Sequence, residues 1–135
     1  MKTQKNLLLI PAILGMLYGL GSIFIPRTFA VFFDIPAENI TPDFVTWIIT
    51  AGTAGIGLGM FAIWSRSLTD INVVKGVMTV FTIFFFLFGV ESLFVQVLVS
   101  GSTFGYTTLI QGIVFLILAI VFFAYKEPKE ETNKQ

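Results

Sequence analysis

The side chain with the clearest chemical potential is one acid, Glu91, inside a long apolar segment. An ionisable group at membrane depth costs a few kcal/mol or more, so it usually faces a bundle interior or a water-filled cavity. Two interpretations follow. Glu91 is either a protonated acid that bonds another helix, or a site that exchanges a proton or binds a cation.

If successive apolar segments cross a membrane in alternating directions, the polar side chains of all four segments lie in the same leaflet as Glu91. Thr46, Thr50 and Thr53 step by four and three residues and form one helical stripe. This pattern predicts a polar pocket with Glu91 near its floor. Its candidate ligand or proton-site residues are Glu91, Gln111, Tyr18, Thr50, Thr53 and Thr108. The alternative is packing: threonine bonds its own i−4 carbonyl, and glutamine bridges helices without a ligand.

Missing residue types exclude much chemistry. The chain has no cysteine and no histidine, which removes thiol catalysis, disulfides, the commonest general base and the usual haem, zinc and copper ligand. A lone carboxylate without a nucleophile–base pair gives little support for an enzyme. We expect no catalytic residues, no metal and no cofactor. The net charge of zero argues against a nucleic-acid partner.

The composition predicts an all-α polytopic membrane protein. Hydrophobic residues make up 56% of the 135 residues and charged residues 12%, with a mean hydropathy of +0.90. Apolar runs of about 20 residues can cross ~30 Å of hydrocarbon as helices. The predicted spans of the antiparallel four-helix bundle are 6–25, 44–65, 73–99 and 105–125. They form one domain, 1–125, followed by a charged cytoplasmic tail, 126–135.

The basic residues predict the orientation. If the chain crosses four times, seven of the eight lie on one side: Lys2, Lys5, Arg66, Lys75, Lys126, Lys129 and Lys134. Only Arg27 lies on the other. By the positive-inside rule both termini are cytoplasmic, in a bacterial cytoplasmic (inner) membrane. The bilayer is then the first partner, and a homodimer or a membrane-protein partner is the second.

The segment after the first span has two interpretations. Residues 28–33 are too apolar for a free loop and predict a short interfacial helix or a re-entrant turn, either capping the bundle or forming a lid over a cavity. Alternatively, Thr28-Phe29-Ala30 imitates the cleavage site of a signal peptide. The apolar run before it is longer than a usual signal core, so we favour an uncleaved helix.

Small residues predict where helices touch. Ala51, Gly55 and Gly59 are spaced by four, and Gly15 and Gly19 repeat the spacing in the first span. Such faces let two helix backbones approach closely. We expect the first and second spans to pair there.

The layout resembles a family of small uncharacterised bacterial four-helix membrane proteins, grouped as a domain of unknown function. The resemblance covers roughly residues 7–125 and is carried by Gly19–Pro26, by Phe29–Phe33 with Pro36 after it, and by Gly52–Gly59. It implies a fold and a membrane location but no activity. Small multidrug transporters also have four short spans and one membrane glutamate, but theirs lies in the first helix.

Two functions follow from these features. The favoured one is a non-enzymatic integral membrane protein that binds a partner protein or lipid through its helix bundle. The alternative is a small proton-coupled transporter or channel component. In that case Glu91 would exchange a proton for a cationic or amphipathic substrate.

Overall fold

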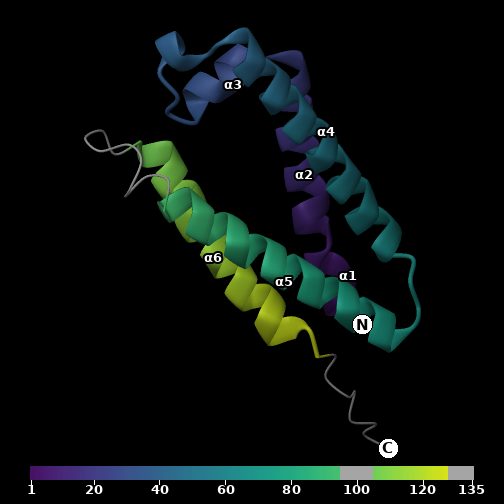
Figure 1. The fold of residues 1–135 in the computed structure, drawn as a ribbon. Helices are drawn as coiled ribbons and strands as arrows, with labels where there is room; N and C mark the ends of the chain where they lie inside the picture. Colours follow the sequence, from purple (N-terminus) through teal and green to yellow (C-terminus); the bar gives the residue numbers. More distant parts are fainter. Residues whose placement is uncertain (95–104, 128–135) are drawn as a thin grey trace, which may run out of the picture.

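The computed structural model describes residues 1–94 and 105–127, which form helices and short connections without any strand (Figure 1). The elements are α1 (Lys2–Leu7), α2 (Leu9–Phe24), α3 (Pro26–Phe32), a 3₁₀ turn (Ala37–Asn39), α4 (Pro42–Ser65), α5 (Ile71–Phe94) and α6 (Tyr106–Tyr125). The all-α prediction is therefore confirmed for the described residues. Four helical stretches among them are long and apolar enough to cross a membrane: Lys2–Phe24, Pro42–Ser65, Ile71–Phe94 and Tyr106–Tyr125.

These stretches follow the predicted spans closely at most boundaries. The third span, predicted at 73–99, is helical from Ile71 to Phe94, and residues 95–99 lie outside the described part of the chain. Most of the predicted tail, 128–135, lies outside it too. The segment after the first span forms the short helix α3. A short helix was one of the two conformations predicted for it.

Proline and capping residues explain where the helices begin. Pro11 lacks an N–H and its ring crowds the carbonyl four residues earlier, which accounts for the break between α1 and α2 at Leu8. Pro26 starts α3 and Pro42 starts α4, both at positions that need no amide donor. The Thr41 hydroxyl caps α4 by accepting a bond from the Phe44 amide at 3.2 Å.

The helices form two antiparallel hairpins, α2 with α4 and α5 with α6. In the first hairpin, a Cβ added to Gly15 would lie 2.5 Å from the Gly55 carbonyl oxygen and 2.8 Å from the Gly59 nitrogen. This contact confirms the predicted pairing of the first two spans. One detail is corrected: Gly52, beside Gly19, continues the face, whereas Ala51 is exposed. A helix has 3.6 residues per turn, so each step of four residues overshoots a full turn by about 40°. Two such steps separate Ala51 from Gly59, and together they rotate Ala51 away from α2.

A second glycine contact joins α5 and α6. A Cβ on Gly89 would lie 3.1 Å from the Gly112 carbonyl oxygen, and a Cβ on Gly112 would lie 3.2 Å from the Gly89 carbonyl oxygen. Neither glycine stands in a repeated small-residue pattern, so this contact carries no sequence signal of the kind present at Gly15 and Gly19.

The two hairpins converge at the end that carries α1 and diverge toward the end that carries α3 (Figure 1). We call these the α1 end and the α3 end. The buried core near the α1 end contains Leu8, Ala12, Ala62, Val74, Val77, Met78, Phe81, Phe85, Phe115, Ala119 and Phe122. Hydrogen bonds close this end. The Gln4 amide donates to the Tyr125 carbonyl at 3.0 Å, and the Arg66 Nε–H donates to the Lys5 carbonyl at 2.9 Å.

The glycine face generates the first prediction. Gly15→Ala should lower the stability of the fold by about 1–3 kcal/mol, because its methyl group would overlap the backbone of α4. The matched control is Gly57→Ala, since a Cβ at Gly57 meets nothing within 4 Å. Unfolding of both variants by a denaturing detergent measures the difference. Equal midpoints would contradict the α2–α4 contact.

Candidate functional site

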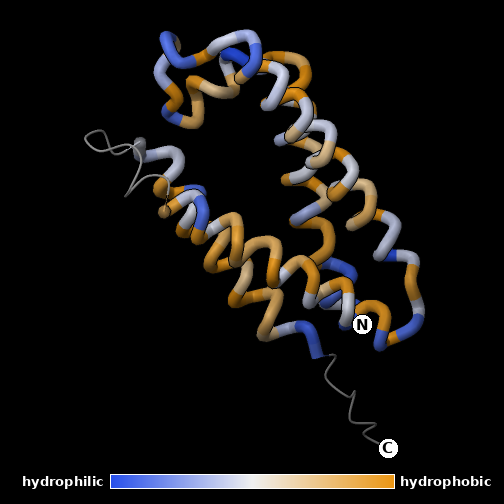
Figure 2. The backbone as a smooth tube through the Cα atoms, in the orientation of Figure 1, coloured by the Kyte–Doolittle hydropathy of each residue, from blue (hydrophilic) through white to orange (hydrophobic). Residues whose placement is uncertain are grey.

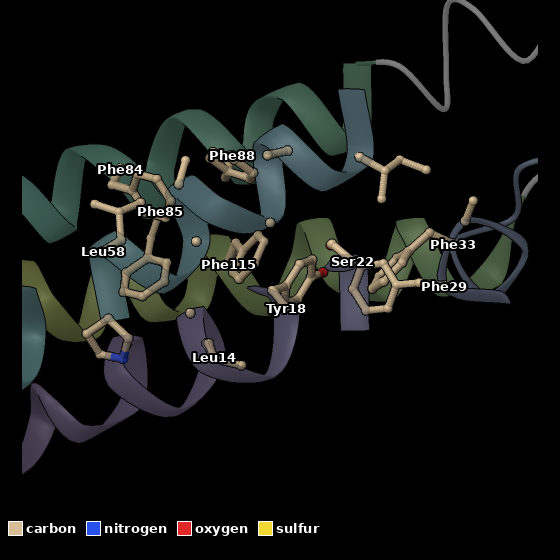
Figure 3. A pocket seen from close by; sticks show the side chains of 18 of the residues that line it. Leu14, Tyr18, Ser22, Phe29, Phe33, Leu58, Phe84, Phe85, Phe88 and Phe115 are labelled. Atoms are coloured by element: carbon tan, nitrogen blue, oxygen red, sulfur yellow. The ribbon is translucent and has the colours of Figure 1, made fainter. Parts of the chain in front are cut away.

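A cavity of about 390 Å³ lies between the two hairpins and under α3 (Figure 3). Its volume falls in the usual range of small-molecule pockets. Five helices and the segment after α3 contribute to its wall: Pro11, Leu14, Gly15, Tyr18, Ser22, Phe29, Ala30, Phe33, Ile35, Ile48, Ala51, Gly52, Ala54, Gly55, Leu58, Phe81, Phe84, Phe85, Phe88 and Phe115. None of these side chains is charged, and only Tyr18 and Ser22 carry a polar side-chain atom.

Aromatic rings form much of the wall. The Tyr18 ring lies 5.4 Å from the ring of Phe29, 5.2 Å from Phe33 and 6.4 Å from Phe115, measured between centroids. Phe115 in turn stacks on Phe85 at 5.7 Å. These separations are those of favourable aromatic pairs. Tyr18 therefore links α2 to α3 and to the second hairpin, as the close view shows (Figure 3).

The opposite part of the wall is made of small residues. Gly15 on α2 and Gly52, Gly55, Ala51 and Ala54 on α4 all line the cavity. Their lack of bulk lets the α2–α4 backbones approach and leaves space in front of the phenylalanines of α5. The cavity also reaches the surface of the bundle, because Ala51, Ala54 and Phe88 are exposed.

The α3 segment closes the cavity through its last turn. Asp34 has φ +64°, the left-handed conformation that asparagine and aspartate adopt more readily than other side chains. The Asp34 amide donates to the Val31 carbonyl at 3.0 Å, and the Ile35 amide donates to the Ala30 carbonyl at 3.2 Å. This pair of bonds is a Schellman motif. It turns the chain so that Phe33 and Ile35 both face the cavity.

Asp34 also holds the second hairpin. Gly105 precedes α6 and has no side chain to cap it, and Asp34 takes over this role from a distant part of the chain. Its Oδ2 accepts a bond from the Thr108 amide at 3.0 Å. The Thr108 hydroxyl lies 3.1 Å from the Phe33 carbonyl oxygen and 3.3 Å from Asp34 Oδ2. A negative charge at a helix N-terminus is favourable, so this contact fastens α3 to α6.

The structure does not bring the six predicted site residues together. Glu91 is exposed and does not line the cavity, and the half-buried Gln111 does not line it either. Thr50 and Thr53 are exposed, and their hydroxyls donate to the Thr46 carbonyl at 2.9 Å and the Ile49 carbonyl at 3.0 Å. This is the self-bonding alternative. Thr108 belongs to the contact with Asp34, so Tyr18 alone lies in the cavity.

The predicted polar pocket is therefore replaced by an apolar one. Residues at the same depth on different helices do not necessarily point toward each other. The rotation of each helix about its own axis decides which side chains face one another. Phe29, Ala30 and Phe33 were detectable, since their spacing places them on one face of a short helix. The bond from Asp34 to Thr108 joins positions 74 residues apart and carries no local sequence signal.

No protein-family model matches the chain, and no curated protein and no solved structure matches it. The resemblance to the four-helix bacterial family stays a prediction that rests on the glycine, proline and phenylalanine positions quoted above.

The Asp34 contact gives the second prediction. Asp34→Ala should lower stability by about 1–2 kcal/mol, because it removes the cap of α6 and places alanine at a positive φ. Asp34→Asn should cost less, since asparagine tolerates that φ and keeps an acceptor oxygen. Glu38→Ala is the control, an exposed acid in the same connection. Denaturing-detergent unfolding measures all three, and a loss no larger for Asp34→Ala than for Glu38→Ala would contradict the capping role.

Proposed function

We propose that this chain is an integral membrane protein that binds a lipid or another apolar molecule of the bilayer between its two helical hairpins. The observation that carries the proposal is the 390 Å³ cavity with its almost entirely apolar, aromatic wall. A bilayer supplies ligands of that chemistry at high local concentration. Exposed Ala51, Ala54 and Phe88 at the cavity give such a molecule a way in from the side.

Several features support a membrane location. Hydrophobic residues run along the helices, and the polar residues gather toward the ends and connections (Figure 2). Trp47 and Trp64 lie near opposite ends of α4 and are 74% and 56% exposed, as expected for rings at the two bilayer interfaces. We propose a bacterial cytoplasmic membrane, in which the chain crosses four times as a helix bundle.

The charge distribution supports cytoplasmic termini. Lys2, Lys5, Arg66, Lys75 and Lys126 belong to the α1 end, and Arg27 belongs to the α3 end. Five of the six basic residues in the described part thus gather at one end of the helices. By the positive-inside rule the α1 end is cytoplasmic.

Binding is favoured over proton-coupled transport. A transport site of the predicted kind needs an acid that competes for substrate and proton inside a cavity. Among the described residues, no acidic or basic side chain lines this cavity, and Glu91 is exposed on α5. An exposed carboxylate in an apolar helix is instead consistent with a homodimer or a membrane-protein partner that covers it.

A cavity-filling variant tests the binding function. Ala54→Phe should reduce the amount of co-purifying lipid several-fold, because its ring would occupy the space in front of the α5 phenylalanines. Native mass spectrometry of the protein released from mild detergent measures bound lipid. Ala124→Phe is the matched control, because Ala124 is exposed on α6 and does not line the cavity. Equal lipid retention by the wild type and both variants would contradict the proposal.

The orientation is tested through the absence of cysteine. Glu38→Cys and Ser67→Cys each introduce a single thiol at an exposed connection on opposite ends of the helices. In intact cells a membrane-impermeant maleimide should label position 38, and it should label position 67 only after lysis. The reverse pattern would place the termini outside.

A further inference from the structure

Two hydroxyl groups interrupt the apolar wall of the cavity. Tyr18 and Ser22 are four residues apart on α2, so they lie on one face of the helix. Ser22 is only 4% exposed. In the described part of the chain, neither hydroxyl has a hydrogen-bond partner, although the threonines of α4 all have one.

Both hydroxyl oxygens are accessible from the cavity, since among the described residues the buried side-chain polar atom without a partner is Gln4 Oε1. A ligand that covered these hydroxyls without offering an acceptor would remove their bonds to water without replacement, which is unfavourable. Both groups are O–H donors, and the same oxygen atom of a ligand can accept from two donors. The wall offers no cation to neutralise an acid and no carboxylate to pair with an amine. Charged head groups are therefore disfavoured at this position.

We infer that the cavity selects a neutral apolar molecule with a carbonyl-type acceptor oxygen, placed against Tyr18 and Ser22. The inference rests on the proposed binding function and names the class of ligand. The rings of Phe29, Phe33, Phe85 and Phe115 surround the ligand body. Two sources have this chemistry: a ring ketone or quinone, and the ester group of a lipid chain.

The test uses benzophenone, a neutral aromatic ketone that attaches to nearby C–H bonds under ultraviolet light. Protein in lipid nanodiscs is irradiated with it, and labelled peptides are mapped by mass spectrometry. Competition then compares fluorenone with fluorene, which has the same ring system without the carbonyl group. Methyl palmitate represents the chain-ester source, with hexadecane as its partner without an acceptor.

Labelling should fall on the cavity-lining peptides. At least one carbonyl compound should compete about ten-fold better than its hydrocarbon partner, and Tyr18→Phe should remove most of that ratio. Tyr106→Phe is the control, since Tyr106 is 77% exposed and does not line the cavity. The more effective carbonyl compound identifies the source.

The possible failures are distinguishable. If each carbonyl compound competes only as well as its hydrocarbon partner, the acceptor inference is wrong and apolar binding stands. The same conclusion follows if Tyr18→Phe keeps the wild-type ratio. If benzophenone labels no cavity peptide and no compound competes, the proposed binding function itself is wrong.

Discussion

The close approach of α2 and α4 determines the shape of the whole molecule. Gly15 and Gly19 face Gly52, Gly55 and Gly59, and the two helix backbones touch. In a membrane, where lipid tails are as apolar as side chains, such backbone contact is a main source of helix association. The second hairpin presents phenylalanines toward this glycine face. Bulky rings hold the hairpins apart, and the space that remains between them is the cavity.

Polar contacts then fix how far the hairpins separate. At the α1 end, the Gln4 amide donates to the Tyr125 carbonyl and so joins the first hairpin to α6, while the Arg66–Lys5 bond lies within the first hairpin. At the α3 end, Asp34 caps α6. The Asp34 bond is exposed and the Gln4 bond is partly buried, so the second is the more sheltered of the two. The two hairpins are thus joined by a polar contact at each end of the helices.

The sequence predicted where the helices lie along the chain better than it predicted which side chains face each other between helices. Run length, hydropathy and proline positions reflect local constraints, so α4 and α6 were located within a few residues. The pairing at Gly15 was predicted because small residues repeated at a fixed spacing. The cavity was not, because it depends on how far each helix is rotated about its axis. Glu91 shows this limit: its chemistry suggested an interior position, and helix rotation leaves it exposed.

The hydroxyl groups of the α4 threonines and of Tyr18 differ in whether they can bond their own helix. This difference determines which of them point to a ligand. Thr46, Thr50 and Thr53 satisfy themselves on their own helix, so their presence requires no ligand. Tyr18 cannot do this, because its ring carries the hydroxyl far from its own backbone. A phenylalanine would serve equally well if packing were its only role. Because Tyr18 has no partner among the described residues, its hydroxyl supports the proposed bond to a ligand in the cavity.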